Sequence, residues 1–600
     1  MQTNAPAIND ISFLIRHIIG YENLNALEGY TDVTSDMVDV MLTESGKISS
    51  EVLAPLNKIG DNHGCTFENG VVRTPPGFKE AYEQVNSGGW FSLNSDTDYG
   101  GQGLPLTLST AVQEIFDSSN MAFGLIPLLS NSAVELLSAH ASDSQKDIYL
   151  PNIISGKWAT TMNLTEPHAG SDVGALRTKA VKAGNHYKIT GEKIYITGGE
   201  HDYTENIIHL VLARTPGAPQ GNKGISLFIV PKFLINEDST IGQKNDLRCV
   251  SIEQKLGIHA SPTCVMAYGD NGGAIGYLVG KENEGLACMF TMMNMARICV
   301  GVQGVGIAQG AYNQAKDYAN NRVQGTRADA KGKKRPAMII EHPDVKRMLM
   351  DMKSKTESIR ALALYTSYCF DVSKRHPISE KRIQFSERVS LLTPIVKAWA
   401  TDKAIKIADI GIQIHGGMGY IEESGASQYW RDARITPIYE GTNGIQAIDL
   451  VNRKIVRDDG KSLFLLIEEI EENLYNFSNL ENNKFSDLGE LVHESVNTLS
   501  RSTVFLLNQA GIDPDLVESA ARVFLDILGN TVCAWLMLLQ AGSCEKLLIA
   551  KNLDPLFLES KIKTVKHFLK WQLPEVLALE KILLEGQNDL SLVSKEDFDV

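Results

Sequence analysis

The chain has 600 residues, of which 43% are hydrophobic and 22% are charged, and its formal net charge is -15. This length exceeds what one hydrophobic core organises, so three or four domains of a globular enzyme are expected. The acidic balance argues against nucleic acid or an anionic membrane surface as the main partner.

The eight cysteines include no CxxC pair and no Cys/His spacing typical of a metal site, which indicates reduced and mostly buried thiols. Residues 1–10 lack the basic start and apolar run of a signal peptide. The most apolar candidate for a membrane span, residues 532–539, is far too short. These features predict a cytoplasmic protein with no metal and no integral membrane segment.

Residues 1–158 are predicted to form a helical N-terminal domain. Asp10 is placed to cap a first helix, and apolar spacing predicts further helices over residues 35–53 and 77–86. Another helix is expected through Leu108 to Phe116, followed by an apolar segment.

The hydrophobic period changes from helical to alternating at Trp158. Residues 178–199 are predicted to form two strands around a turn at Gly184 and Asn185, and shorter strands are expected beyond them. A compact antiparallel β domain is therefore predicted over residues 159–280.

Helical periodicity returns in residues 281–458, which are predicted to form a C-terminal helical bundle. Long helices are expected over residues 286–320, 343–373 and 391–415, with a basic, solvated loop at residues 327–335.

The first of these helices contains four glycines, namely Gly301, Gly304, Gly306 and Gly310. A glycine inside a helix costs about 1 kcal/mol relative to alanine. Close packing of another element, most simply a second helix, is therefore expected against this backbone.

Residues 459–600 are predicted to be an appended helical domain. Residues 461–600 hold 12 Lys and Arg against 22 Asp and Glu, a balance of -10. This part contains no group of residues that indicates chemistry.

The strongest chemical candidate in the chain is Glu440, between Ile438 and Tyr439 on one side and a glycine-containing turn on the other. A poorly solvated carboxylate disfavours its charged form, so its proton affinity rises, which suits a general base. Thr442 or Asn443 can cap the helix that follows. On these residues alone, a capped helix start with a surface glutamate remains an alternative.

Three motifs occur in a defined order. TEPHAGSD covers residues 165–172, GEKIYITGG covers 191–199, and IYEGTNGIQ follows RDARI at 431–435. With the order helices, small β domain, helices, the chain resembles the flavin-dependent acyl-CoA dehydrogenases over about residues 80–455. Its size resembles the enlarged members, including bacterial long-chain acyl-CoA dehydrogenases and 3-(methylthio)propanoyl-CoA dehydrogenases.

The resemblance implies an α+β fold with an N-terminal helical domain, a middle antiparallel β-barrel domain and a C-terminal helical bundle, to which residues 459–600 add a helical domain. It also implies FAD as the cofactor and Glu440 as the catalytic base. One branch of the family carries its base immediately before an arginine that corresponds to Arg297 in this chain. The residue before Arg297 is Ala296, which leaves Glu440 as the matching base.

The resemblance assigns further site residues. The implied cofactor-binding residues are Met162, Leu164, Thr165, Tyr195, Thr197, Arg322, Gln324, Gln413, Gly416, Gly417, Thr442 and Gly444. The implied substrate-binding residues are Ser171, Asn294, Arg297 and Gly441. Tyr195 stands where the family more often has tryptophan, and as a strand neighbour of Thr197 two residues away it is expected on the same face.

The implied reaction is α,β-dehydrogenation of an acyl-CoA to a trans-2-enoyl-CoA, with electrons passed to an electron-transfer flavoprotein. Arg322 and Gln324 match positions that reach the flavin's diphosphate-adenosine arm across a subunit interface, so a homodimer or homotetramer is expected. The residues leave open a straight-chain or a 3-(methylthio)propanoyl substrate.

Two other functions are compatible with parts of the pattern. An acyl-CoA oxidase would share the base and the flavin but would let oxygen reach the reduced ring. A nucleic-acid-binding relative would need a basic C-terminal domain, and the balance of -10 in residues 461–600 argues against it.

Overall fold

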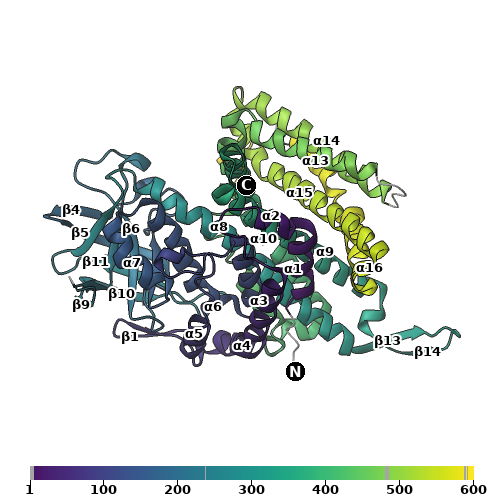
Figure 1. The fold of residues 1–600 in the computed structure, drawn as a ribbon, viewed down its shortest axis with the longest axis horizontal. Coiled ribbons are helices and arrows are strands. Elements are labelled where there is room, and N and C mark those ends of the chain that lie inside the picture. The colour runs from purple at the N-terminus through teal and green to yellow at the C-terminus, as the bar shows by residue number, and fades with distance from the viewer. Residues whose placement is uncertain (1–5, 237, 480–484, 587–589, 591, 600) are drawn as a thin grey trace. The chain divides into compact units, whose positions relative to one another are not determined.

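The computed structural model describes residues 6–236, 238–479, 485–586, 590 and 592–599. The chain forms two compact units, Glu44–Cys299 and a second unit made of Met1–Thr43 with Val300–Val600 (Figure 1). Two helices, α3 (Ser35–Ile48) and α8 (Gly285–Asn321), contribute residues to both units. The four-domain boundaries expected from the sequence stay a prediction.

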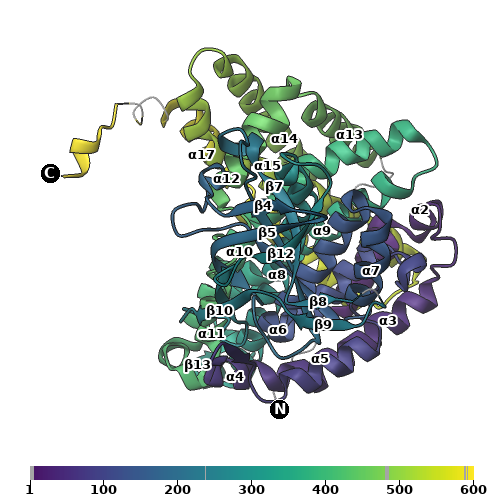
Figure 2. The same ribbon diagram turned by 90° about the vertical axis from the view of Figure 1, so that its left-hand side faces the viewer.

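The unit Glu44–Cys299 is built around an eight-stranded sheet in the order β10-β11-β5-β12-β7-β6-β3, with β4 paired beside β5 (Figure 2). The strands are β3 (Trp158–Asn163), β4 (Lys179–Ala183), β5 (His186–Thr197), β6 (Asn206–Ala213), β7 (Ser226–Pro231), β10 (Leu247–Ile252), β11 (Thr263–Tyr268) and β12 (Ala274–Val279). Strand β3 pairs with β6 in parallel, whereas the other pairs of this sheet are antiparallel. The expected antiparallel β domain is confirmed apart from that pair.

Burial along the strands explains their sequence pattern. Strands β6 and β7, with the apolar runs NIIHLVLA and SLFIVP, are buried along their whole length, as expected for strands covered on both faces. Helix α6 packs beside β3. Strand β5 has a mixed burial pattern, so some of its side chains are available to a ligand.

The remaining elements of this unit precede the sheet or decorate it. They are α4 (Ala54–His63), β1 (Thr66–Glu68), β2 (Val71–Arg73), α5 (Phe78–Ser87), α6 (Leu106–His140), α7 (Asp143–Ile154), β8 (Phe233–Ile235) and β9 (Ile241–Lys244). The helix and the apolar segment expected after Leu108 are two helices that meet at Asn120, which has φ -159° and ψ 85°. The side chain of Asn120 accepts a hydrogen bond from the Phe123 N–H at 3.2 Å, so it caps the second half.

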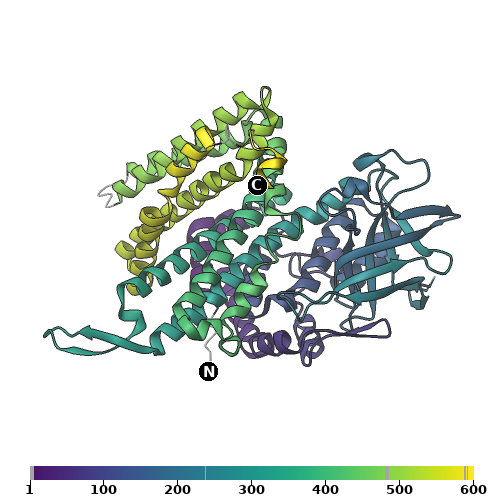
Figure 3. The ribbon, with the colours of Figure 1, turned by 180° about the vertical axis from the view of Figure 1, so that it is seen from behind.

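In the residues that the structure describes, the other unit is helical apart from one hairpin (Figure 3). Its helices, besides part of α3 and α8, are α1 (Ile8–Leu14), α2 (Tyr21–Asn25), α9 (Pro343–Arg375), α10 (Ser379–His415), α11 (Ala426–Ala433), α12 (Asn443–Asp449), α13 (Lys461–Ser478), α14 (Ser486–Ala510), α15 (Pro514–Ala550), α16 (Pro555–His567) and α17 (Glu575–Lys581). The helical bundle and the appended helices are confirmed, although α10 begins twelve residues before the expected start.

Two of the four glycines of α8, Gly301 and Gly304, lie against another helix, as expected. A Cβ added at Gly301 would be 2.3 Å from Val396 Cγ1, and one added at Gly304 would be 3.4 Å from the Thr401 Cα. Val396 and Thr401 belong to α10, so these two glycines allow the two helix backbones to approach closely.

Two local predictions are wrong. Asp10 does not cap the first helix: the cap position is Ala7, and the Asp10 carboxylate is buried against Arg360 Nη1 at 2.6 Å and Lys561 Nζ at 2.5 Å. The basic loop is instead a hairpin of β13 (Val323–Ala328) and β14 (Lys334–Met338). Its side chains are exposed apart from Ala337, so it forms without burying an apolar face.

Helices α6, α8 and α15 are long and apolar enough to cross a membrane, judged by length and composition alone. Residues 532–539, the most apolar candidate, belong to α15, so the expectation that this candidate is far too short to span a membrane was wrong. Their most apolar windows are 78%, 67% and 83% buried within the protein.

Candidate active site

The turn that carries Glu440 has an unusual backbone. Glu440 has φ 56° and the next residue, Gly441, has φ 83°. A non-glycine residue in this left-handed region costs roughly 1–2 kcal/mol, and such conformations cluster at functional sites. Glu440 is half-buried and its Oε2 is shielded from solvent. A strained turn therefore presents a carboxylate with restricted access to water.

Side chains from three helices fix this turn. Lys397 Nζ donates to the Gly441 carbonyl at 2.7 Å, and Gln446 Nε2 donates to the Glu440 carbonyl at 3.0 Å. The Tyr439 hydroxyl donates to Gln303 Oε1 on α8.

Helix α12 starts immediately after the turn. The Thr442 hydroxyl accepts a hydrogen bond from the Ile445 N–H at 3.3 Å, so of the two cap candidates Thr442 takes that role. Gly444 is exposed, and a Cβ there would touch only Thr442 at 3.9 Å. The start of α12 therefore leaves open space beside a helix N-terminus, which suits an anionic group.

In the unit Glu44–Cys299, the motifs TEPHAGSD and GEKIYITGG lie side by side. The Ile194 N–H donates to the Thr165 carbonyl at 3.0 Å. Thr165 and Thr197 are half-buried, and Tyr195 is 61% exposed. The two threonines and the tyrosine assigned to the flavin are thus in neighbouring segments of one unit.

Tyr195 is exposed because β5 carries a bulge. The pairing of β5 with β11 shifts between Cys264 opposite Ile196 and Met266 opposite Lys193, and Tyr195 has φ 59°. A bulge re-aims a side chain. The expectation that Tyr195 and Thr197 share a face agrees with their exposure, but regular alternation is not its cause.

A buried ion pair that the sequence reasoning missed joins the same two motifs. Lys193 Nζ donates to Glu166 Oε1 at 2.9 Å and to the Leu164 carbonyl at 2.9 Å. Glu166 also accepts from the Arg177 and Thr178 N–H groups at 2.7 and 3.0 Å. The sequence offered one signal for this ion pair, because a lysine in the otherwise apolar strand segment KIYIT indicates a buried cation that needs a partner.

Burial acts on both members of this pair. Burial lowers the pKa of Lys193 to about 8, because Glu166 offsets only part of the desolvation of the ammonium. Burial alone would raise the pKa of Glu166, but Lys193 and the hydrogen-bond donors hold it below its usual value. The pair fixes the segment that contains Thr165 onto β5.

Five of the residues assigned to cofactor binding lie at one end of the helical bundle. The rings of Tyr318 on α8 and His415 on α10 stack with centroids 4.3 Å apart, so the C-terminal ends of these helices adjoin. The five residues lie within three residues of the C-terminal end of α8 or α10, and all are exposed. They are Arg322, Gln324, Gln413, Gly416 and Gly417. A Cβ at Gly416 or Gly417 would meet no atom within 4 Å.

The assigned substrate residues have different environments. Arg297 is buried on α8, and its Nη1 donates to Asn294 Oδ1 at 3.3 Å. Ser171 is exposed, beside Gly170, where a Cβ would meet nothing within 4 Å. Arg297 and Ser171 belong to one unit and Glu440 to the other, so their expected meeting around one substrate stays a prediction.

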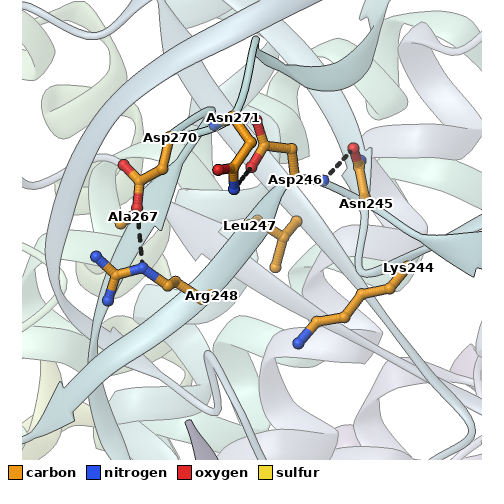
Figure 4. Close-up of a pocket in the computed structure, with 8 residues that line it drawn as sticks. All are labelled: Lys244, Asn245, Asp246, Leu247, Arg248, Ala267, Asp270 and Asn271. Carbon is orange, nitrogen blue, oxygen red and sulfur yellow. Dashed lines mark hydrogen bonds and ion pairs between the residues drawn. The ribbon is translucent and has the colours of Figure 1, made fainter.

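A polar cavity of about 410 Å³ also opens on the β domain (Figure 4). It is lined by Lys244, Asn245, Asp246, Leu247, Arg248, Ala267, Asp270 and Asn271. Ala267 lies near the end of β11, whereas Thr197 pairs with Thr263 at its start. None of the assigned site residues lines this cavity.

The comparisons with known proteins agree with this arrangement. Four family models match in order: the acyl-CoA dehydrogenase N-terminal domain over residues 68–157, its middle domain over 161–270, its C-terminal domain over 283–455, and an acetyl-CoA dehydrogenase C-terminal-like domain over 466–593. The chain therefore belongs to the FAD-dependent acyl-CoA dehydrogenase family and acts on acyl-CoA substrates. The resemblance, the fold and the cofactor expected from the sequence are confirmed.

Relatives match over nearly the whole chain. The chain is 45% identical to the 3-methylmercaptopropionyl-CoA dehydrogenase of Ruegeria pomeroyi, over 96% of this chain and 97% of that protein. It is 34% identical to a butyryl-CoA dehydrogenase of Syntrophomonas wolfei, over 96% of each chain. A solved acyl-CoA dehydrogenase of Bacillus anthracis complexed with FAD has a TM-score of 0.74 at 21% identity, over 94% of this chain and 90% of that one, and shows the shared fold.

The residues present fit an FAD. Tyr195 offers an exposed aromatic ring beside two hydroxyl side chains. The open backbone at Gly416 and Gly417 follows α10 at the end of the bundle where Arg322 follows α8, and the guanidinium of an arginine suits a diphosphate.

Proposed function

We propose that Glu440 is the base that removes the α proton of an acyl-CoA thioester. The observation that carries this proposal is the left-handed Glu440–Gly441 turn, whose carboxylate is partly withdrawn from water. The strained conformation is held by hydrogen bonds to both carbonyl groups of the turn, which is expected where the position of a side chain matters for chemistry.

The chemistry requires such a group. A C–H bond beside a thioester is a weak acid, so its removal needs a positioned, poorly solvated base and hydrogen-bond donors for the developing enolate oxygen. We assign the backbone N–H of Glu440 to that oxygen, and Arg297 and Asn294 to orientation of the substrate. FAD, when bound, accepts the β hydride.

The other assigned residues of the unit Glu44–Cys299 are proposed to bind the flavin ring or the acyl-CoA. Thr165 and Thr197 are proposed to hydrogen-bond the edge of the flavin ring, and Tyr195 to shield its face. Met162 and Leu164 are proposed to contact the ring, and Ser171 to contact the CoA thioester. Glu166 and Lys193 support these groups, because their ion pair joins the segment that contains Thr165 to strand β5.

Replacing Glu440 by glutamine tests the base directly. The Glu440→Gln variant should keep FAD and acyl-CoA binding but lose anaerobic bleaching of the flavin by substrate, because an amide cannot take the proton. Absorbance at the flavin band follows the reaction. Bleaching at a near-normal rate would remove Glu440 from this role.

We propose a short acyl chain as the substrate, with 3-(methylthio)propanoyl-CoA as the first candidate. The similarity to the Ruegeria pomeroyi enzyme supports it, and the similarity to a butyryl-CoA dehydrogenase supports a short chain in general. The methylthio acyl group has as many non-hydrogen atoms as pentanoyl, so the two should fill one pocket similarly.

A panel of acyl-CoAs in the anaerobic bleaching assay tests the substrate proposal. The methylthio substrate should have the highest ratio of the bleaching rate constant to the half-saturating substrate concentration, with pentanoyl-CoA next and octanoyl-CoA much lower. A preference for octanoyl-CoA or longer chains would contradict a short pocket. Slow reoxidation in air and fast reoxidation by an electron-transfer flavoprotein would support that partner, whereas fast reoxidation by oxygen would indicate an oxidase.

A further inference from the structure

Lys397 occupies an unusual position beneath the catalytic turn. It lies in the middle of α10 within the apolar run TPIVKAWA, and its side chain is fully buried. Its Nζ donates to the Gly441 carbonyl at 2.7 Å and to Asn443 Oδ1 at 2.9 Å. Burying an ammonium group is costly unless hydrogen bonds compensate it, and here two of those hydrogen bonds go to the residues directly after Glu440.

Asn443 extends this contact along α10. Its Nδ2 donates to the Ala398 carbonyl at 3.0 Å, to Thr401 Oγ1 at 3.0 Å and to Asp402 Oδ1 at 2.9 Å. The side chain of Asn443 thus uses both its oxygen and its nitrogen against α10. A simple helix start would need only the Thr442 cap, so these contacts serve the placement of the turn.

The second contact to the turn comes from α12. Gln446 is fully buried, and its Nε2 donates to the Glu440 carbonyl at 3.0 Å. Its Oε1 has no hydrogen-bond partner among the described residues. Leaving a buried acceptor unsatisfied costs about 1–3 kcal/mol, so Gln446 is poorly explained by stability alone.

We propose that Lys397 and Gln446 are positioning residues that form a two-point clamp on the left-handed Glu440–Gly441 turn. Each fixes one of two successive carbonyl groups, and together they set the orientation in which the Glu440 carboxylate is presented. The proposal rests on Glu440 as the base. Displacing a catalytic group by about 1 Å can cost about 10²-fold in rate.

The test is the rate of flavin bleaching in Lys397→Met, followed in an anaerobic stopped-flow instrument with substrate in excess. We expect the bleaching rate constant to fall about 10- to 100-fold. The bleaching amplitude per FAD should stay near that of the wild type, because each folded molecule still binds FAD and substrate. A role in folding alone would lower the amplitude or the yield and leave the rate constant of the active fraction unchanged.

An isotope effect separates proton removal from other steps. With substrate deuterated at Cα, the primary isotope effect on bleaching should be at least as large in Lys397→Met as in the wild type, since proton abstraction becomes more rate-limiting. An isotope effect that vanishes while the rate falls would place the defect elsewhere and overturn the proposal.

The matched control is Lys403→Met. Lys403 is a second buried lysine on α10, and its Nζ lies 3.5 Å from Glu575 Oε2 in the appended helices. This variant removes a buried ammonium from the same helix without touching the Glu440–Gly441 turn, so its bleaching rate constant should stay within about twofold of the wild type.

Gln446→Met keeps the proposal testable if Lys397→Met fails to fold. It removes the donor to the Glu440 carbonyl together with the unsatisfied Oε1, so folding should be maintained, and the rate constant should fall as in Lys397→Met. A wild-type rate constant in either folded variant would overturn the clamp. Glu440→Gln, measured in parallel, identifies the failing proposal: loss of bleaching there with normal rates in the clamp variants would refute only the clamp.

Discussion

At the scale of single residues, ionisation of the buried Asp117 carboxyl group lowers the free energy of unfolding. It is 2% exposed on α6, and burial raises its pKa to about 8. The Gln113 Nε2 donates to its Oδ2 at 3.0 Å. Because the pKa of Asp117 in the folded state lies above its ordinary value of 3.8, the folded state keeps its proton between about pH 4 and pH 8, whereas the unfolded state has released it. The free energy of unfolding should therefore fall across that window.

Asp117→Asn removes this cost. The variant should resemble the wild type near pH 4 and become more stable as pH rises, by at most about 6 kcal/mol above pH 8, at about 1.4 kcal/mol per unit of pKa. Urea unfolding at pH 5, 7 and 9 measures the difference. Asp143→Asn is the control, because that side chain is 99% exposed. A difference independent of pH would show that Asp117 is ionised throughout.

At the residue scale, the sequence offers a candidate only where the signal is local. Glu440 stands out because its immediate neighbours are apolar on one side and include glycine on the other. Lys397 gave no comparable signal, because its partner Gly441 is 44 residues away. The outward position of Tyr195 depends on the bulge opposite β11, and a bulge is set by strand pairing that a single strand's sequence does not specify.

At the scale of elements, the approach of α8 to α10 gives a paired prediction of opposite sign. A Cβ at Gly301 would lie 2.5 Å from the Val396 carbonyl oxygen, which is backbone and cannot rotate away. Gly301→Ala should therefore force the helices apart and lower the free energy of unfolding by about 1–3 kcal/mol. Thermal unfolding measures this loss.

Gly304→Ala is the matched variant on the same helix. Its new methyl group would lie 3.4 Å from the nearest atom, the Thr401 Cα, an ordinary contact. Alanine has the higher helix propensity by about 1 kcal/mol, so this variant should unfold at an equal or higher temperature. Equal losses in both variants would show that the loss does not come from the closer approach of α10 at Gly301.

The elements themselves were predictable to different degrees. Long periodic helices such as α9 were placed within a few residues of their ends. The β13–β14 hairpin was missed because its side chains are polar and exposed, so no hydrophobic alternation marks its strands. The parallel pairing of β3 with β6 was missed because strand direction depends on the connections between strands, which the period of a strand does not encode.

At the scale of the whole molecule, contacts between distant segments were beyond the sequence. Asp10 in α1 accepts from Arg360 in α9 and from Lys561 in α16, and Lys561 also donates to Glu357 at 2.8 Å. These groups are buried and up to 551 residues apart in sequence. Burial opposes ionisation of Asp10, but the two cations lower its pKa to about 2. The network joins the N-terminal segment, the bundle and the appended helices. Because the partners of Asp10 are distant in sequence, the residues next to it indicated only a helix cap.

The assembly of the enzyme depends on the exposed end of the bundle where α8 and α10 finish. Arg322 lies there beside Gln324, with its Nη2 3.5 Å from Gln324 Oε1, and the open glycines Gly416 and Gly417 follow α10.

If this end holds the diphosphate of a neighbouring subunit's FAD, Arg322→Ala removes a charge-assisted hydrogen bond worth about 1.5–3 kcal/mol. FAD affinity, measured by flavin release on dilution, should then fall about 10- to 100-fold, while FAD-free protein unfolds at the wild-type temperature. Arg327→Ala, in strand β13, which begins directly after Arg322, and also exposed, should retain FAD normally. Unchanged affinity in Arg322→Ala would remove this end of the bundle from the cofactor site, and the expected subunit interface would lose its main support.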